Sequence, residues 1–280
     1  MILKGTSGAD TLINIASLVT IKAGKGDDTI HNEGSQVTID ASAGNDRINN
    51  EGAQVTIDGG KGNDDIDNYA VQNVLIFGNA GKDDIRIDTS YKNGVIKVST
   101  KSTVEGGSGD DHIYNYGGGL LSLSGGTGSD WIENNGYMND SNDVTFSPDK
   151  STLSGGAGND WLYNNGGKQV SVSGGSGDDY IVNNVFTDWS TTTTSLLPDK
   201  TTLDGGDGSD SIYNYYGKQV TILGGKGNDN ITNSGNSVKI NDTEGNEYIQ
   251  NTGKKVTIDS GRVTTQSKTA NIPRPSKIQT

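Results

Sequence analysis

The chain has 280 residues, of which 42 are glycine, 30% are hydrophobic and none is cysteine, and its formal net charge is −13. The lack of cysteine excludes disulfides and cysteine-based zinc sites. The excess of acids over scattered Lys and Arg argues against nucleic-acid binding. No stretch approaches the length of a membrane span, and the N-terminus lacks a signal-peptide pattern. Low hydrophobicity with high net charge is typical of disorder, so folding requires something that neutralises the acids.

A Gly-rich turn that ends in an acid recurs from residue 5 to about residue 250. Its clearest copies are Gly59–Ile66, Gly155–Leu162 and Gly224–Ile231. Successive closing acids are 18, 18, 18, 19, 28, 19, 30, 19, 31, 19 and 18 residues apart. This repeat indicates a solenoid, which places one carboxylate at the same position of each coil. The closing acids are Asp10, Asp28, Asp46, Asp64, Asp83, Asp111, Asp130, Asp160, Asp179, Asp210, Asp229 and, in a degenerate last copy, Glu247.

Two short apolar segments lie between successive Gly-rich turns, as residues 47–50 and 55–57 illustrate. Both alternate with period two, which predicts strands with one buried face. Two strands and two turns fit into about 18 residues, which is short for a three-sided coil. We therefore predict an all-β fold, a right-handed parallel β-roll or β-solenoid of about twelve 18–19-residue coils. The solenoid is predicted over residues 1–263, and the polar, Pro-containing residues 264–280 are predicted to be a flexible tail.

The register of the coils predicts three stacked columns. A column of stacked amides can hydrogen-bond from coil to coil. Ile87 interrupts the Asn column once. The inward column of the strand after the turn is Leu12, Ile30, Ile48, Ile66, Ile85, Ile113, Ile132, Leu162, Ile181, Ile212, Ile231 and Ile249. The facing strand supplies pairs such as Val19/Ile21, Val37/Ile39, Val55/Ile57, Val170/Val172, Val220/Ile222, Val238/Ile240 and Val256/Ile258. The Asn column is Asn14, Asn32, Asn50, Asn68, Asn115, Asn134, Asn164, Asn183, Asn214, Asn233 and Asn251.

Three coils carry extra residues, in segments 88–103, 136–152 and 185–202. These segments occur in every second coil from the fifth onward, between the strand after one turn and the strand before the next. We therefore expect a row of loops along the edge away from the Gly-rich turns, with roots about 10 Å apart.

The turn consensus Gly-Gly-x-Gly-x-Asp-x-(Ile/Leu)-x resembles the calcium-binding nonapeptide of the RTX (repeats-in-toxin, haemolysin-type) family. The resemblance implies calcium ions between stacked turns, held by Asp carboxylates and Gly-rich backbone carbonyls. Elementary chemistry agrees, because Ca²⁺ takes six to eight oxygen ligands and glycine permits the dihedrals that turn carbonyls inward. Without a cation, carboxylates stacked about 5 Å apart would repel one another.

The chain departs from the usual family pattern in having one Gly-rich turn per coil, so we expect about ten calcium ions along one edge only. Three copies are degenerate: Ala41-Ser42 replaces Gly-Gly, Asn79 replaces the second Gly, and Asp242-Thr243 stands in the last copy. Sites near both ends are expected to be weaker. The predicted metal-site residues are Asp10, Gly24, Gly26, Asp28, Gly44, Asp46, Gly60, Gly62, Asp64, Gly81, Asp83, Gly107, Gly109, Asp111, Gly126, Gly128, Asp130, Gly156, Gly158, Asp160, Gly175, Gly177, Asp179, Gly206, Gly208, Asp210, Gly225, Gly227 and Asp229.

Aromatic residues concentrate on one outward strand face of the middle coils. Exposed apolar patches commonly mark interaction sites, and long loops can also cover them. Both interpretations stay open here: loops carrying Tyr91, Tyr137 and Trp189 dock over the face, or the face binds a glycan or a protein. The candidate ligand-binding residues are His112, Tyr114, Trp131, Trp161, Tyr163 and Tyr180.

Support for catalysis is thin, and we predict that the chain is not an enzyme. His31 and His112 lie in different coils with no nucleophile placed against them. The charged residues Asp65, Asp67, Asp84, Arg86 and Asp88 share outward positions on two neighbouring coils. We interpret them as cross-strand salt bridges rather than as the cluster of a polysaccharide lyase or epimerase.

Together these patterns predict an extracellular or cell-surface bacterial protein that binds calcium and folds on binding it. A structural or adhesive role is expected, with end-to-end self-assembly as one form. Two alternatives remain: a glycan- or protein-binding module that uses the aromatic face, and an accessory domain of a secreted enzyme.

Overall fold

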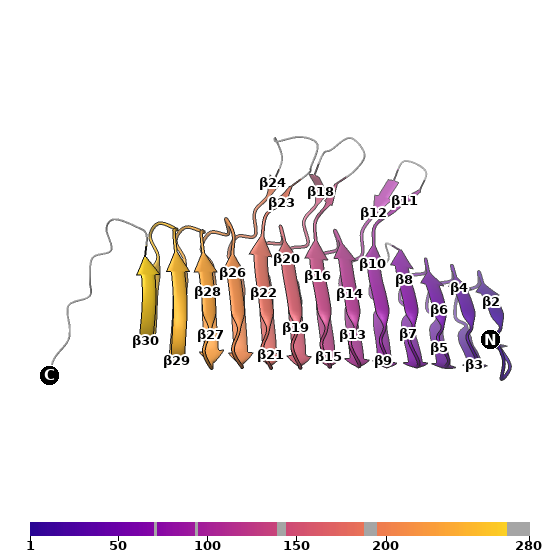
Figure 1. Cartoon of the computed structure of the whole chain (residues 1–280). Helices are drawn as coiled ribbons and strands as arrows, with labels where there is room; N and C mark the ends of the chain where they lie inside the picture. Colours follow the sequence, from indigo (N-terminus) through magenta and orange to yellow (C-terminus); the bar gives the residue numbers. More distant parts are fainter. Residues whose placement is uncertain (70–71, 93–94, 139–143, 188–194, 268–280) are drawn as a thin grey trace.

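The computed structural model describes residues 1–69, 72–92, 95–138, 144–187 and 195–267. In these ranges the chain forms strands and no helix. It winds into a parallel β-solenoid in which each coil contributes one strand to each of two ladders, so the predicted fold of about twelve coils is confirmed (Figure 1). Nowhere in the described part of the chain is there a helix that could span a membrane.

The first sheet is built from the strands that lead into the Gly-rich turns. Each strand begins with a Thr/Ser or aliphatic residue, buries one aliphatic side chain, and continues into the first residues of the turn. Its members pair in the order β1 (Ile2–Lys4), β3 (Thr20–Lys25), β5 (Thr38–Ala43), β7 (Thr56–Lys61), β9 (Leu75–Ala80), β13 (Thr103–Ser108), β15 (Ser122–Thr127), β19 (Thr152–Ala157), β21 (Ser171–Ser176), β25 (Thr202–Asp207) and β27 (Thr221–Lys226).

The second sheet is built from the strands that leave the turns. Each begins directly after the closing acid and ends at or just beyond the Asn column. Its members pair in the order β2 (Thr11–Asn14), β4 (Thr29–Asn32), β6 (Arg47–Asn50), β8 (Asp65–Tyr69), β10 (Asp84–Asp88), β14 (His112–Tyr116), β16 (Trp131–Asn135), β20 (Trp161–Asn165), β22 (Tyr180–Asn184), β26 (Ser211–Asn214) and β28 (Asn230–Asn233).

The last two strands, β29 (Lys239–Asn251) and β30 (Thr257–Ser267), contribute to both sheets. They pair with each other in parallel up to Asn251↔Ser267, with a register shift between Asp242 and Asn246. The sheet therefore extends past residue 263, where the sequence predicted the solenoid to end. Residues 268–280 lie outside the described residues, and their assignment as a tail stays a prediction.

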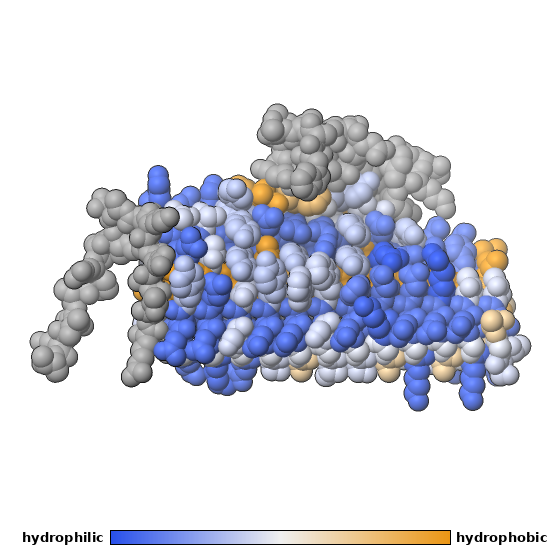
Figure 2. All heavy atoms as spheres, in the orientation of Figure 1, coloured by the Kyte–Doolittle hydropathy of each residue, from blue (hydrophilic) through white to orange (hydrophobic). Residues whose placement is uncertain are grey.

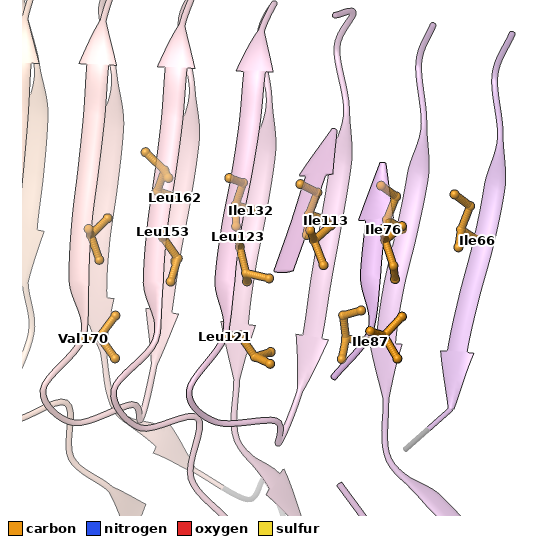
Figure 3. Packing of buried hydrophobic residues seen from close by; sticks show 14 of the residues in the cluster. Ile66, Ile76, Ile87, Ile113, Leu121, Leu123, Ile132, Leu153, Leu162 and Val170 are labelled. Atoms are coloured by element: carbon orange, nitrogen blue, oxygen red, sulfur yellow. The ribbon is translucent and has the colours of Figure 1, made fainter. Parts of the chain in front are cut away.

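The core is a pair of aliphatic columns between the two sheets. Register pairing stacks Ile66 on Ile85 and Ile85 on Ile113, so equivalent residues of successive coils lie in line. These side chains are fully buried, and Figure 3 shows the columns repeating from coil to coil. The predicted inward residues are buried from Leu12 to Ile249, while Val256 and Ile258 of the final coil are partly buried. The solenoid is thus held by a narrow core and by continuous strand ladders.

The Asn column closes the opposite edge of the core. Apart from Asn68 and the last member, Asn251, each Asn side chain donates through Nδ2 to Oδ1 of the next Asn, as from Asn32 to Asn50 at 2.7 Å, and also to a carbonyl of the connection that follows it. Ile87 takes the place of an Asn in the fifth coil, as predicted. Because of this, Nδ2 of Asn68 is buried without a hydrogen-bond partner.

Three hairpins leave this same edge, in the connections that follow β10, β16 and β22. They are β11 (Ser90–Lys92) with β12 (Val95–Lys97), β17 (Tyr137–Met138) with β18 (Val144–Phe146), and β23 (Phe186–Thr187) with β24 (Ser195–Leu196). Figure 1 shows them in a row on the edge opposite the Gly-rich turns.

Candidate metal column

The backbone of the Gly-rich turn is set by two glycines in conformations that other residues avoid. In one turn Gly60 has φ 107° and Gly62 has φ 120°, and the equivalent glycines of other coils have φ between 103° and 148°. A Cβ at Gly62 would collide with the carbonyl oxygen of Gly44 in the preceding coil. Glycine is therefore required both for the dihedrals and for stacking of backbone directly on backbone.

The degenerate turns keep the same backbone shape. Ser42 and Asn79, which replace the second glycine, both have φ 78°. Positive φ at a residue other than glycine costs roughly 1–2 kcal/mol, less for Asn. The coil stacking is therefore strong enough to impose the turn on these two sequences, and the turns ending at Asp46 and Asp83 remain in register.

The closing acids from Asp28 to Asp229 form a buried column along the turn edge. Each is between 0% and 2% exposed. In every case Oδ1 accepts a hydrogen bond from the backbone N–H of the preceding closing acid, at 2.7–2.8 Å. The sequence predicted the column itself but not this ladder, in which one carboxylate oxygen of each coil is used to join two coils.

The second carboxylate oxygen of each acid in this column is buried and lacks a hydrogen-bond partner. In the seven turns that close with Asp64, Asp83, Asp111, Asp130, Asp160, Asp179 and Asp210 it lies over the first glycine of its own turn, where a Cβ would clash with it. The ten unpartnered atoms are Oδ2 of Asp28, Asp46, Asp64, Asp83, Asp111, Asp130, Asp160, Asp179, Asp210 and Asp229.

Burial makes the charged form of these acids costly. Desolvation, reinforced by the neighbouring carboxylates, raises the pKa of Asp64 and Asp83 to about 6 and that of Asp130 and Asp179 to about 7. The backbone N–H bonded to Oδ1 lowers the pKa but does not cancel the effect. At neutral pH the bare column therefore opposes folding, because burying an unpaired charge is unfavourable.

The donor set fits a hard cation such as Ca²⁺. Each turn offers an unpartnered carboxylate oxygen beside Gly-rich main chain, and oxygen ligands are what Ca²⁺ binds. Among the described residues, no three His, Cys, Asp or Glu side chains come together to hold a metal by themselves. A cation here would therefore need ligands from backbone carbonyls as well as from the Asp carboxylates.

The first coil differs from the rest of the column. Oδ2 of Asp10 accepts hydrogen bonds from the backbone N–H of Thr6 at 2.5 Å and from its hydroxyl at 2.9 Å. Thr6 stands where the other turns have their second glycine. The predicted metal ligand Asp10 is thus already satisfied by protein donors.

The last coil differs in the opposite direction. Asp242 occupies the position of the first glycine, and sequence reasoning treated it only as a degenerate substitution. The structure buries both Asp242 and Glu247, and all four of their carboxylate oxygens lack partners. An acid at an inward-facing position of the repeat was the signal that could have identified this site.

The six candidate ligand-binding aromatics lie together on the second sheet. Their rings stack along the solenoid axis, with centroids of Trp131 and Trp161 5.1 Å apart at an interplanar angle of 22°. The row continues through Tyr163 and Tyr180, and His112 meets Tyr114 edge-on. We call His112, Tyr114, Trp131, Trp161, Tyr163 and Tyr180 the aromatic strip.

The sequence makes two predictions for the aromatic strip: that the long loops dock over it, or that it binds a glycan or a protein. Both stay predictions. Tyr137 of the β17–β18 hairpin packs at Gly117, on the hairpin edge, and Trp161 is 46% exposed. Trp189 and the side chain of Tyr91 lie outside the described residues. Trp131 stacks on both Trp161 and Tyr163, whereas Tyr180 is tilted against Trp161 and Tyr163.

The charged patch on β8 and β10 consists of ion pairs. Arg86 binds Asp84 at 2.7 Å, Asp65 at 3.0 Å and Asp67 at 3.1 Å. The pairs with Asp65 and Asp67 cross from β10 to β8, so the predicted cross-strand salt bridges are confirmed, whereas Asp84 lies on the same strand as Arg86.

Comparison with known proteins agrees with this description of the turns. Residues 54–70, 102–119 and 150–168 match the profile of the RTX calcium-binding nonapeptide repeat (4 copies). No curated protein is significantly similar to the chain. A solved structure, the A-module of the Azotobacter vinelandii mannuronan C-5 epimerase AlgE4, aligns over 96% of this chain and 88% of that chain, with 11% identity and a TM-score of 0.29. The chain thus contains RTX calcium-binding nonapeptide repeats, in turns that stack along a parallel β-solenoid.

Proposed function

We propose that the chain is a structural solenoid that folds when Ca²⁺ binds along its turn edge. The observation that carries this proposal is the row of ten buried Oδ2 atoms without partners, in a chain of net charge −13. Bound calcium supplies the positive charge that makes burial of these carboxylates favourable. Binding free energy then becomes folding free energy, because the column does not exist in the unfolded chain.

The ligands in each coil are the closing Asp and the carbonyls of the Gly-rich turn. Asp111 with Gly107 and Gly109 is one such set, and the other predicted sets repeat it. The glycines let the turns stack closely, and the N–H bond to Oδ1 fixes each carboxylate so that Oδ2 faces the turn. The chain's own residues thus set the direction in which the folded column presents its oxygens to the cation.

Calcium is proposed on one edge only, with about ten ions per chain. The opposite edge supports this, because the Asn column satisfies itself through amide hydrogen bonds and carries no charge. At the first coil, the donors of Thr6 remove the need for a cation at Asp10.

An extracellular, structural or adhesive role follows from this dependence on calcium. Millimolar calcium is available outside cells, and modules that bind it weakly are folded there. End-to-end contact is one form of this role: within the described residues β1 and β2 pair on one side only, and the N-terminal coil exposes Ile13 and Ile15. Figure 2 shows hydrophobic residues gathered at this end.

Glycan binding by the aromatic strip, in which Trp161 is 46% exposed, is a second candidate role. Sugars stack on exposed ring faces, and here Trp131 already stacks on Trp161 and on Tyr163. Catalysis is not proposed, because Arg86 of the charged patch is engaged in ion pairs with Asp65, Asp67 and Asp84.

Circular dichroism on the full chain at pH 7.5 tests the proposal. We expect a disordered spectrum in calcium-free buffer and a β-sheet spectrum after addition of millimolar CaCl₂. A monovalent salt added to the same ionic strength should cause no such change. A β-sheet spectrum that persists after complete calcium removal would refute calcium-driven folding.

A further inference from the structure

The C-terminal end of the Asp column differs in composition from every turn before it. In the interior coils one carboxylate oxygen per turn lacks a partner, whereas the last coil contributes four such oxygens, from Asp242 and Glu247. Asp242 is 1% exposed and Glu247 is 2% exposed. Oδ2 of Asp229, in the coil before, is also buried and unpartnered.

The two acids of the last coil lie over glycines of two consecutive turns. The carboxylate of Asp242 lies against Gly224, so that a Cβ on that glycine would contact all three of its carboxyl atoms. In the interior turns this space over the first glycine is taken by Oδ2 of the closing acid, as at Gly205 and Asp210. Glu247 folds back over Gly245 of its own turn, 2.9 Å from the position of a Cβ there.

The column has no further acid beyond Glu247. In the register of β29 and β30, Glu247 pairs with Val263 and Asp242 pairs with Ser260. A cation next to Glu247 would therefore lack a carboxylate from a following coil. Asp242 replaces that missing charge from within the same coil, which explains why an acid stands where the repeat has glycine.

We propose that Asp242 and Glu247 form a terminal divalent-cation site that differs from the repeat sites in having two buried, unpartnered acids in one coil, with Asp229 as the adjacent charge. The site extends the calcium-binding role proposed above and takes the same kind of cation. Bound there, the cation fixes β29 against β27 and β28 and ends the column.

Hydrogen exchange on the full chain, read by mass spectrometry with and without CaCl₂, tests the site. The variant is Asp242→Asn with Glu247→Gln, which keeps size and removes both charges. The control is Glu244→Gln with Asp259→Asn, which removes two charges from exposed positions on the same strands. Segment 239–251 reports the terminal site, and segment 103–116 reports the repeat sites.

In the wild type and the control, calcium is expected to protect both segments. In the Asp242/Glu247 variant, calcium should still protect segment 103–116 from exchange but should no longer protect segment 239–251. Without calcium, segment 239–251 of this variant should be at least as protected as in the wild type. About one fewer calcium ion should be bound per chain, measured by equilibrium dialysis.

The proposal of a terminal site is wrong if the Asp242/Glu247 variant binds as many calcium ions as the wild type, or if calcium still protects segment 239–251 of that variant. It is also wrong if calcium protects segment 103–116 of the wild type but not segment 239–251. If calcium protects neither segment of the wild type, this result would instead contradict calcium-driven folding as a whole.

Discussion

At the scale of single residues, the solenoid depends on how each Asp of the column uses its two oxygens. Oδ1 of Asp111 accepts the backbone N–H of Asp83 at 2.8 Å, whereas Oδ2 is buried without a partner. One side chain thus joins two coils and also presents a charge that folding alone leaves uncompensated. The first role needs only an oxygen acceptor, but the second needs the charge.

Substitution of Asp111 by Asn separates these two roles. The amide keeps an oxygen for the N–H of Asp83 but removes the charge, so we expect about one or two fewer calcium ions per chain. A higher calcium concentration should also be needed for half-maximal folding. Equilibrium dialysis and a calcium titration followed by circular dichroism measure both effects.

The matched control is Asp110→Asn, at the neighbouring position. Asp110 is exposed, and its Oδ1 accepts a hydrogen bond from Ser129 that Asn can also accept. Its calcium stoichiometry should equal that of the wild type. Equal losses in both variants would show that general charge reduction, rather than the Asp column, sets calcium binding.

Glycine at the fourth position of the turn is equally specific. Gly62→Ala should destabilise the folded chain by at least about 2 kcal/mol, because alanine is strained at φ 120° and its Cβ would strike the carbonyl oxygen of Gly44. The expected readout is a higher calcium midpoint and a lower urea midpoint.

Gly8→Ala serves as the control for this substitution, because no atom lies within 4 Å of a Cβ at that position. Its midpoints should stay close to those of the wild type. If Gly62→Ala behaves like Gly8→Ala, the turns do not stack as closely as the structure shows.

At the scale of the elements, the Asn column is the neutral counterpart of the Asp column. It stabilises the other edge of the same core through amide hydrogen bonds, without any ion. Its interruption at Ile87 leaves Nδ2 of Asn68 unpartnered.

Ile87→Asn should complete the Asn column at little cost. The loss of a buried aliphatic side chain costs about 1.5–3 kcal/mol, and each of the two new hydrogen bonds, to Asn68 and Asn115, contributes about 0.5–1.5 kcal/mol. The free energy of unfolding in saturating calcium should therefore change by no more than about 1–2 kcal/mol. Urea denaturation measures it.

Ile85→Asn, two residues away on the same strand, is the contrasting variant. Ile85 stacks between Ile66 and Ile113, so an amide there would be buried without a partner. The cost should exceed about 3 kcal/mol. Equal destabilisation by the two substitutions would contradict the proposed completion of the Asn column.

At the scale of the whole molecule, the column of raised pKa values makes the calcium-free chain sensitive to pH. Burial raises the pKa of Asp46, Asp111 and Asp210 to about 6 and that of Asp130 and Asp179 to about 7, from 3.8. Between pH 3.8 and the raised pKa values, the folded chain binds more protons than the unfolded chain. The free energy of unfolding therefore falls as pH rises from about 4 to about 7.

Without calcium, the chain should be more ordered near pH 5 than at pH 7.5. Calcium replaces the protons, so its stabilising effect should grow as pH rises through the same window. Circular dichroism in buffers freed of calcium by a chelating resin, across pH 4.5 to 8, measures both trends. Stability that rises with pH in calcium-free buffer would contradict the buried, unpaired state of the column.

Much of the architecture could be predicted because the same residue types recur at the same positions of successive coils. When each coil has nearly the same length, equivalent residues must stack, so Ile66, Ile85 and Ile113 form a column whatever the details of the backbone. The same argument located the Asp column, the Asn column and its interruption at Ile87. The hairpin edge followed from where the extra residues enter the repeat.

The sequence by itself thus determined the coil, the columns and the calcium-type turn, because these follow from periodicity and from glycine's dihedral freedom. Tertiary structure alone decided which carboxylate oxygens have donors. The N–H groups that bind Oδ1 come from another coil, Thr6 satisfies Asp10 through the shape of its turn, and Asp242 points inward over Gly224. It likewise decided how the rings of the aromatic strip lie against one another, since side-chain direction depends on neighbours that the repeat does not specify.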